Sequence, residues 1–286
     1  MKFDKKIVSV LSLLAALFFI PTACFIARSP VIILSDGSFS VLYGEKRMRA
    51  ETFRNSLSLF RRVITVTVAD DSGEDIVPHA VTEVSSDPYC VIFPLRFTGS
   101  ARLYKDKNPG IPVILLEGRN SGNVTGFEFS YKTDLDMDFQ KAGQAALHIA
   151  SGGKTAVFLE SSVERQAKEA FLRGLGEENA SNAHFYTNFS YFNPIPDLSC
   201  AVLAGIGGEF MEENAGIPVI FMSWLDPALL PSNVVMLLND SPQAQVLEAV
   251  RLFSTGEKEG RIGSKIVVLK GKNIDKKILR KIRKIG

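Results

Sequence analysis

The feature that most constrains this chain is the regular alternation of short apolar runs with helix-length amphipathic segments. This order of elements is typical of βαβ units built around parallel sheets. The expected strands are 31–34, 63–68, 90–94, 112–116, 155–159, 185–186, 199–203, 218–222, 234–238 and 266–269. The expected helices are 44–60, 136–151, 163–175, 209–214 and 243–253.

The pattern divides into two series. The first series closes near residue 116. An alternating segment at 126–131 then leads into the helix 136–151, which begins the second series and is ended by Gly152 and Gly153. The first helix, 44–60, carries Phe53, Leu57 and Phe60 at helical spacing, as in a βα unit. The stretch 70–88 predicts at most one short helix. Two α/β sheets of similar size are therefore expected.

The amino terminus has the pattern of a secretory signal. The first six residues carry a net positive charge, with Lys2, Lys5 and Lys6 against Asp4, and fourteen uncharged residues follow, from Ile7 to Ile20. A transmembrane helix needs about 20 apolar residues, so this run is too short to span a bilayer comfortably. We predict a signal peptide over 1–23 and export of the body.

Cys24 follows Thr22-Ala23 directly, an arrangement that resembles the lipobox of bacterial lipoproteins. Pro21 departs from that pattern, because leucine is usual three residues before the cysteine. The resemblance implies lipidation of Cys24 and a tether over 24–29. Simple cleavage and an uncleaved anchor remain alternatives.

The carboxyl terminus is basic although the whole chain has a formal charge of only +2. Its last segment, 272–286, places isoleucines on one side of a helix and lysines and arginines around it. Two interpretations follow. Such a helix can lie on an anionic membrane surface, or it can dock its isoleucines on the second of the two α/β units, and we favour docking.

Motifs for catalysis, cofactors and metals are not recognisable. Gly205-Ile206-Gly207-Gly208 follows a strand, but Phe210 occupies the third glycine position of a dinucleotide fingerprint. The three histidines lack zinc-ligand spacing, and no nucleophile elbow exists. We predict no enzyme activity, no cofactor, no metal and no nucleic-acid partner, and a hydrolase is the least favoured alternative.

Three stretches carry a resemblance to a known fold, namely the helix and strand at 138–159, the strand and helix at 233–253, and Gly256 with the strand 266–269. They resemble the type I periplasmic binding fold of sugar-binding and nucleoside-binding proteins and lac-repressor-type sensor domains. The resemblance covers 30–271. It implies two Rossmann-like lobes with parallel sheets joined by a three-strand hinge.

The implied amino-terminal lobe comprises 30–121 and 241–263, and the carboxy-terminal lobe comprises 122–240 and 264–286 with its basic helix. The chain would cross between lobes near 118–127, 239–242 and 262–265. In this fold the ligand lies between the lobes, at the carboxyl ends of the strands.

That geometry nominates residues that directly follow strands. The candidate ligand-binding residues are Asp36, Ser38, Phe39, Arg96, Phe97, Glu117, Arg119, Ser161, Trp224, Asp226 and Asp240. Carboxylates and arginines would hold hydroxyl groups, and aromatic faces would cover the apolar side of a ring.

Several candidates also have a structural interpretation. Polar residues can shape turns, pair on the surface or cap helices, and aromatic residues can pack in the core or between lobes. Asp36 and Ser38 can shape a turn, Glu117 and Arg119 can form a surface pair, and Asp240 can cap a helix. The aromatic residues can serve as packing; these are Phe39, Phe97 and Trp224.

Two positions depart from the family. Ala167 stands where many members have a ligand-gripping arginine, with Arg165 nearby, and Gly205 stands where an Asn-Asp pair is common. The leading hypothesis is a lipoprotein that captures a small polar ligand, a sugar or nucleoside, for an inner-membrane ABC-type transporter permease or sensor. The rival is a structural or protein-interaction module that kept the fold and lost the ligand.

Overall fold

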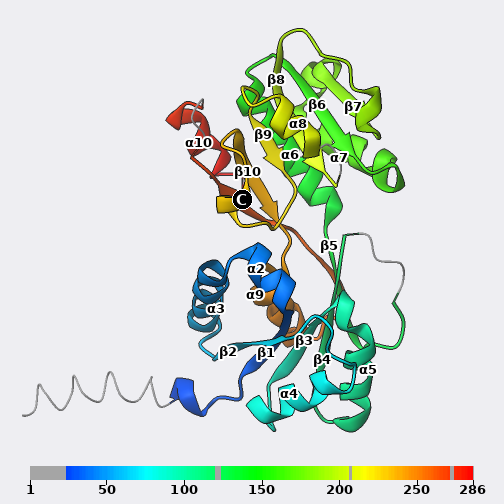
Figure 1. Cartoon of the computed structure of the whole chain (residues 1–286), viewed down its shortest axis with the longest axis vertical. Helices are drawn as coiled ribbons and strands as arrows, with labels where there is room; N and C mark the ends of the chain where they lie inside the picture. The colour runs from blue at the N-terminus through cyan, green and yellow to red at the C-terminus, as the bar shows by residue number, and fades with distance from the viewer. Residues whose placement is uncertain (1–23, 120–123, 206–207, 271–273, 286) are drawn as a thin grey trace, which may run out of the picture.

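The computed structural model describes residues 24–119, 124–205, 208–270 and 274–285, so the predicted signal peptide lies outside it. Two lobes lie one above the other along the long axis (Figure 1). The strands of the first lobe are β1 (Val31–Asp36), β2 (Val63–Val68), β3 (Cys90–Pro94), β4 (Val113–Gly118), β5 (Phe129–Thr133) and β11 (Glu259–Ile262). Those of the second are β6 (Lys154–Leu159), β7 (Ala183–Tyr186), β8 (Leu198–Ala204), β9 (Val219–Phe221), β10 (Val234–Asn239) and β12 (Lys265–Val268).

Each lobe is built on a six-stranded sheet. The strand orders are β11-β5-β4-β3-β1-β2 and β12-β10-β9-β8-β6-β7. All neighbouring strands are parallel except β10 and β12. The fold class predicted from the sequence, two α/β lobes with parallel sheets, is confirmed.

Helices cover both faces of each sheet. They are α2 (Gly37–Tyr43), α3 (Glu45–Leu59), α4 (Ile76–Val84), α5 (Thr98–Lys107), α6 (Leu135–Ala150), α7 (Glu164–Leu175), α8 (Gly208–Glu213), α9 (Pro242–Ser254) and α10 (Lys276–Ile282). In the first lobe, α4 and α5 share one core cluster with the sheet, and α9 contributes to the other. In the second lobe, α6, α7 and α10 cover one face and α8 the other.

The chain changes lobes after Thr133, between Asn239 and Pro242, and between Ile262 and Lys265. One assignment from the sequence is wrong: β5, placed in the second lobe by an expected crossing near 118–127, pairs with β4 on one side and β11 on the other in the first sheet. Ser130 and Tyr131 are buried there, which an interior strand of that sheet requires.

Three elements were missed from the sequence. Helix α2 stands where a turn was expected, because the Asp36 carboxylate accepts a hydrogen bond from the Phe39 amide and caps it. Helix α5 begins with the polar run Thr98-Gly99-Ser100, which gives no apolar periodicity. Strand β11, Glu-Gly-Arg-Ile, is an edge strand with a single apolar residue to mark it.

The basic carboxy-terminal helix docks on the second lobe. Leu279 and Ile282 of α10 are buried in the core cluster that α6 and α7 form, and Ile274, Ile278 and Ile285 pack against it. The docking interpretation of this helix is confirmed, and its apolar side is not available to a membrane.

Helices α6 and α7 approach closely at two glycines. A Cβ atom built on Gly174 would lie 2.0 Å from the carbonyl oxygen of Gln140, and one on Gly143 would lie 2.2 Å from that of Phe171. Both obstacles are backbone atoms, so a methyl group can enter only if the helices separate. Glycine at these positions sets the spacing of the second lobe's outer layer.

We expect Gly174→Ala to lower the free energy of unfolding by about 1–3 kcal/mol, the usual cost of overpacking. Gly110→Ala is the matched control, because nothing lies within 4 Å of a Cβ atom at that position. Urea unfolding followed by circular dichroism measures both. Equal stability of the two variants would contradict the close approach.

Candidate functional site

A pocket of about 550 Å³ lies between the lobes. It opens where β3 and β4 of the first sheet end and where the chain leaves β9 and β10 of the second. Six candidates from the sequence line it, namely Phe39, Arg96, Glu117, Arg119, Trp224 and Asp240. Pro94, Leu95, Leu116, Gly118, Met222, Ser223, Pro242 and Gln245 complete the wall.

An aromatic contact joins the lobes beside this cleft. The Phe39 ring of α2 stacks on Tyr43 at 5.1 Å and lies 4.7 Å from the Trp224 ring of the second lobe. Next to it, the Asp226 amide donates to the Leu42 carbonyl oxygen across the lobes. The aromatic residues therefore serve as packing between lobes and as part of the cleft wall.

Arg96 is the exposed cation of the first lobe's wall. Its Nη1 lies 2.5 Å from Oδ2 of the buried Asp36, and its side chain is 45% exposed. The guanidinium also lies 5.1 Å from the centre of the Phe97 ring, which is buried in the core. Asp36 thus both caps α2 and orients Arg96 at the cleft.

Ser38 faces another part of the surface. Its amide donates to Asp70 Oδ1 at 3.0 Å, and its hydroxyl group contacts the same carboxylate. The hydroxyl bond, followed by the amide bond, lowers the pKa of Asp70. Ser38 holds the loop after β2, and it is absent from the cleft wall.

Arg119 bridges the lobes at the base of the cleft. Its Nη1 donates to the Met222 carbonyl oxygen at 2.6 Å, and its Nη2 donates to that of Leu238 at 3.1 Å. Its Nε lies 2.9 Å from Asp240 Oδ2, with both side chains mostly buried. The surface pair with Glu117 expected from sequence is wrong, because Arg119 spans to the second lobe instead.

Asp240 does not cap α9. The Ser241 hydroxyl oxygen accepts the Ala244 amide at 3.1 Å and occupies the cap, with Pro242 in the first turn. Asp240 instead faces Arg119. Burial raises the pKa of Asp240, and the neighbouring guanidinium opposes that rise.

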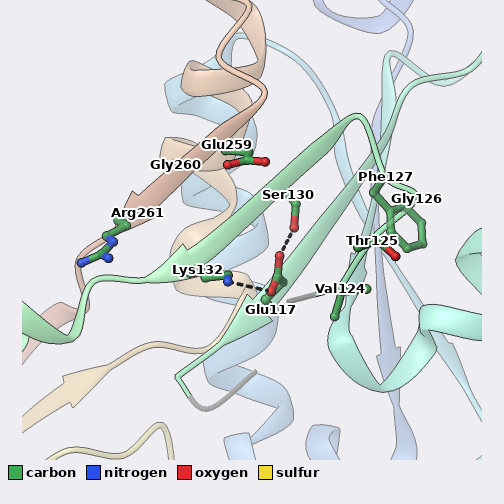
Figure 2. Close-up of a pocket in the computed structure, with 10 residues that line it drawn as sticks. All are labelled: Glu117, Val124, Thr125, Gly126, Phe127, Ser130, Lys132, Glu259, Gly260 and Arg261. Atoms are coloured by element: carbon green, nitrogen blue, oxygen red, sulfur yellow. Dashed lines mark hydrogen bonds and ion pairs between the residues drawn. The ribbon is translucent and has the colours of Figure 1, made fainter. Parts of the chain in front are cut away.

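Glu117 lies at the end of β4 and lines a second pocket, of about 620 Å³, as well as the cleft (Figure 2). Ser130 and Lys132 of β5 point toward its carboxylate, and the Lys132 Nζ atom is 3.6 Å away. Glu259 and Arg261 of the edge strand line the far side. Glu117 is 3% exposed, so its carboxylate is held by the sheet.

Three further candidates lie away from the cleft wall. Phe97 is 7% exposed and packs in the core cluster of the first lobe. Asp226 accepts the Ala228 amide at 3.0 Å and caps a short helical turn. Ser161 is exposed after β6. Conversely, sequence reasoning missed Gln245, which lies in the first turns of α9 directly beyond a crossing.

A buried carboxylate fastens the third crossing. Asp138 of α6 accepts the Ser264 amide at 2.7 Å and also contacts the Ser264 hydroxyl group. Asp138 is fully buried. Burial raises its pKa to about 6, while the bonds from Ser264 and the charge of Arg119 act in the opposite direction.

Because the folded pKa of Asp138 exceeds the unfolded value of 3.8, the folded protein holds this proton more tightly between those pH values. The protonated Asp138 side chain therefore stabilises the folded state, and this contribution is complete below pH 3.8 and is lost as pH rises through 6. We expect the wild type to lose up to about 3 kcal/mol relative to Asp138→Asn across this window. Urea unfolding of both proteins from pH 4 to pH 7 measures the difference, and parallel curves would contradict the shifted pKa.

Removing Arg119 leaves a buried carboxylate and two carbonyl oxygens without their donor. We expect Arg119→Met to lower the free energy of unfolding by about 3–5 kcal/mol at pH 7. Arg165→Met is the control, since Arg165 pairs with Glu169 on an exposed surface and its side chain is 94% exposed. A loss no larger than that of the control would argue against the bridge.

Other features add no chemistry to the site. In the parts of the chain that the structure describes, no group of His, Cys, Asp and Glu could hold a metal ion. Within the same ranges no helix is both long and apolar enough to cross a bilayer. Cys90 and Cys200 are free thiols buried in different sheets, and Cys24 is exposed. The glycine-rich segment 205–208 includes residues 206–207, which lie outside the described ranges.

Solved structures share this two-lobed architecture. The arabinose-binding protein AraP from Geobacillus stearothermophilus is 14% identical, with a TM-score of 0.57, over 84% of this chain and 96% of that chain. A transcriptional activator of the comK gene from Bacillus halodurans is 14% identical, with a TM-score of 0.55, over 90% of this chain and 95% of that one. No protein-family model matches the chain, and no curated protein matches its sequence at a significant level. The chain therefore has the type I periplasmic binding fold.

Proposed function

We propose that this protein is an extracytoplasmic binding lipoprotein that captures a small neutral polar ligand, a sugar or nucleoside, between its lobes. The observation that carries the proposal is the composition of the cleft wall. Aromatic faces of Phe39 and Trp224 lie with Arg96, Gln245 and Ser223 around one pocket at the carboxyl ends of the strands. Such a wall can cover the apolar side of a ring and hydrogen-bond its hydroxyl groups.

The charges of the wall favour a neutral ligand. Arg96 and Arg119 contribute two positive charges, and Glu117 and Asp240 contribute two negative charges. Each of these four side chains already has an oppositely charged protein partner. An ionic ligand would have to break one of these pairs, whereas a hydroxylated ring can share them.

The fold supports transport or sensing as the context. AraP, which has this fold, is an arabinose-binding protein, and two lobes joined by a hinge can close around a ligand. The loaded protein would deliver its ligand to an ABC-type transporter permease or a membrane sensor. The exposed Cys24 at the start of the body supports lipidation there, after cleavage of residues 1–23.

One observation favours the rival, a protein-interaction module that has lost its ligand. Phe39 and Trp224 contact each other, and the polar groups of Arg119 are bound by the protein itself. A ligand must therefore fit beside these contacts. Binding measurements separate the two functions.

Trp224 is the only tryptophan of the chain and lies in the cleft wall, so its fluorescence reports on the site directly. We expect a sugar or nucleoside in a metabolite panel to shift this emission. At about 100 times its dissociation constant, the ligand should stabilise the fold by about 2.7 kcal/mol. Titration of the purified protein, followed by thermal unfolding, measures both effects.

Arg96→Lys keeps a positive charge beside Asp36 but loses the planar donor fork, so we expect affinity to fall about 10-fold. Arg165→Lys, on the exposed face of α7, is the control and should bind like the wild type. The same fluorescence titration measures both variants, and equal affinities would contradict a role for Arg96.

The ligand panel also decides between the two functions. If it leaves both the Trp224 emission and the melting temperature of well-folded protein unchanged, the interaction module replaces the binding protein as the proposed function.

A further inference from the structure

Helix α3 has its polar and apolar sides reversed. Phe53 and Leu57 point outward, with 66% and 59% of their surface exposed. Glu51, Asn55 and Ser56 are the buried residues of the helix. The sequence spacing indicates an ordinary βα helix with its apolar residues on the sheet, and the structure shows the opposite face inward.

Specific polar contacts fix this orientation. The Asn55 side-chain amide donates to the Gln243 carbonyl oxygen at 2.8 Å, and Glu51 is 2.9 Å from the Lys265 ammonium group. The Ser56 hydroxyl oxygen accepts the Val63 amide at 2.9 Å. Rotating α3 to bury its phenylalanine would leave these buried groups unpaired, so the outward apolar side is a stable property of the fold.

The apolar side of α3 continues onto the beginning of the described chain. Phe60 is 42% exposed and its ring lies 5.9 Å from that of Phe25, next to Ile26, which is 57% exposed. Figure 1 shows α3 and the helical residues 24–27 on the same side of the first lobe. We call Ile26, Phe53, Leu57 and Phe60 the α3 patch. The described chain therefore begins, at Cys24, in the short helical segment beside this patch.

Exposed cations border the α3 patch. Lys46 and Arg49 precede Phe53 on the same side of the helix, Arg54 adjoins it, and Arg28 lies over the Phe60 ring. The acidic residues of α3 are Glu45, in an exposed pair with Arg49, and the buried Glu51, which is bound by Arg54 and Lys265. A second copy of this surface would be repelled by like charge, whereas anionic headgroups would be attracted.

We propose that the α3 patch lies in the headgroup region of an anionic bilayer and holds the first lobe against the membrane to which the amino terminus is attached. The inference rests on the proposed anchoring of the chain. Apolar side chains enter the acyl boundary while the surrounding lysine and arginine residues bind phosphates, as in an interfacial helix. Helix α10, with its isoleucines buried in the second lobe, has no such face to offer.

The full-length chain, with Cys24→Ser and Ala50→Cys, is labelled with an environment-sensitive fluorophore and added to vesicles of phosphatidylglycerol and phosphatidylcholine. Ala50 is exposed and lies one helical turn before Phe53, while Cys90 and Cys200 are buried. We expect the emission to roughly double on vesicle contact, because the label enters an apolar boundary. Ser162→Cys, exposed on the second lobe, is the control position and should not respond.

Adding Phe53→Ser and Leu57→Ser should abolish the rise without loss of folding, because both side chains are exposed. Cys24→Ser removes the proposed lipid site but keeps the apolar run 7–20, so sedimentation with the vesicles reports attachment through that run separately. Trp224 titration reports ligand binding separately. Sedimentation without a rise in emission from the label at position 50 would overturn the proposal, as would an equal rise from the label at position 162. A rise in emission with protein concentration in the absence of lipid would also overturn it, because it would show a second copy on the patch. A smaller rise on pure phosphatidylcholine would support the role of charge.

Discussion

The guanidinium group of Arg119 is the contact on which the arrangement of the two lobes depends. It leaves the end of β4 in the first lobe and binds two carbonyl oxygens of the second lobe and the carboxylate of Asp240. A planar group with several donors can hold two backbone segments and a carboxylate at once, which lysine cannot do. The cleft walls are positioned by this junction, so the shape of the pocket and the relation of the lobes have a common origin.

Asp138 complements this junction from the other side of the hinge. Arg119 ties the end of β4 to residues at the second crossing, and Asp138 fastens Ser264 at the third. Both side chains are ionisable groups that are mostly or fully buried. A hinge built in this way can pivot about fixed points, since the second and third crossings are held by directional bonds.

Much of this architecture could be predicted from the sequence, because buried parallel strands appear as continuous apolar runs. The runs at β1, β3, β8 and β10 are of this kind and were located within a few residues. Strand β11 and helix α5 lack apolar periodicity, and β5 was assigned to the wrong lobe, because local pattern does not reveal which sheet a strand joins. The sequence predicts where the candidate site lies, at residues that directly follow strands. It does not predict the partners of Arg119 or the helix cap at Ser241, because these depend on tertiary contacts. The exposure of the apolar side of α3 could not be predicted either. Helical spacing identifies which residues share a face, but it does not show whether that face contacts the sheet or the solvent.

The three crossings also determine when each lobe can become complete. The first lobe needs α9 and β11, which lie beyond residue 241, and the second needs β12 and the docked α10. Neither hydrophobic core can close until nearly the whole chain is available. A polypeptide passing amino terminus first through a narrow channel would therefore remain incompletely folded until its last segments arrive, and loss of a short carboxy-terminal segment would remove packing from the lobe whose strands begin at residue 154.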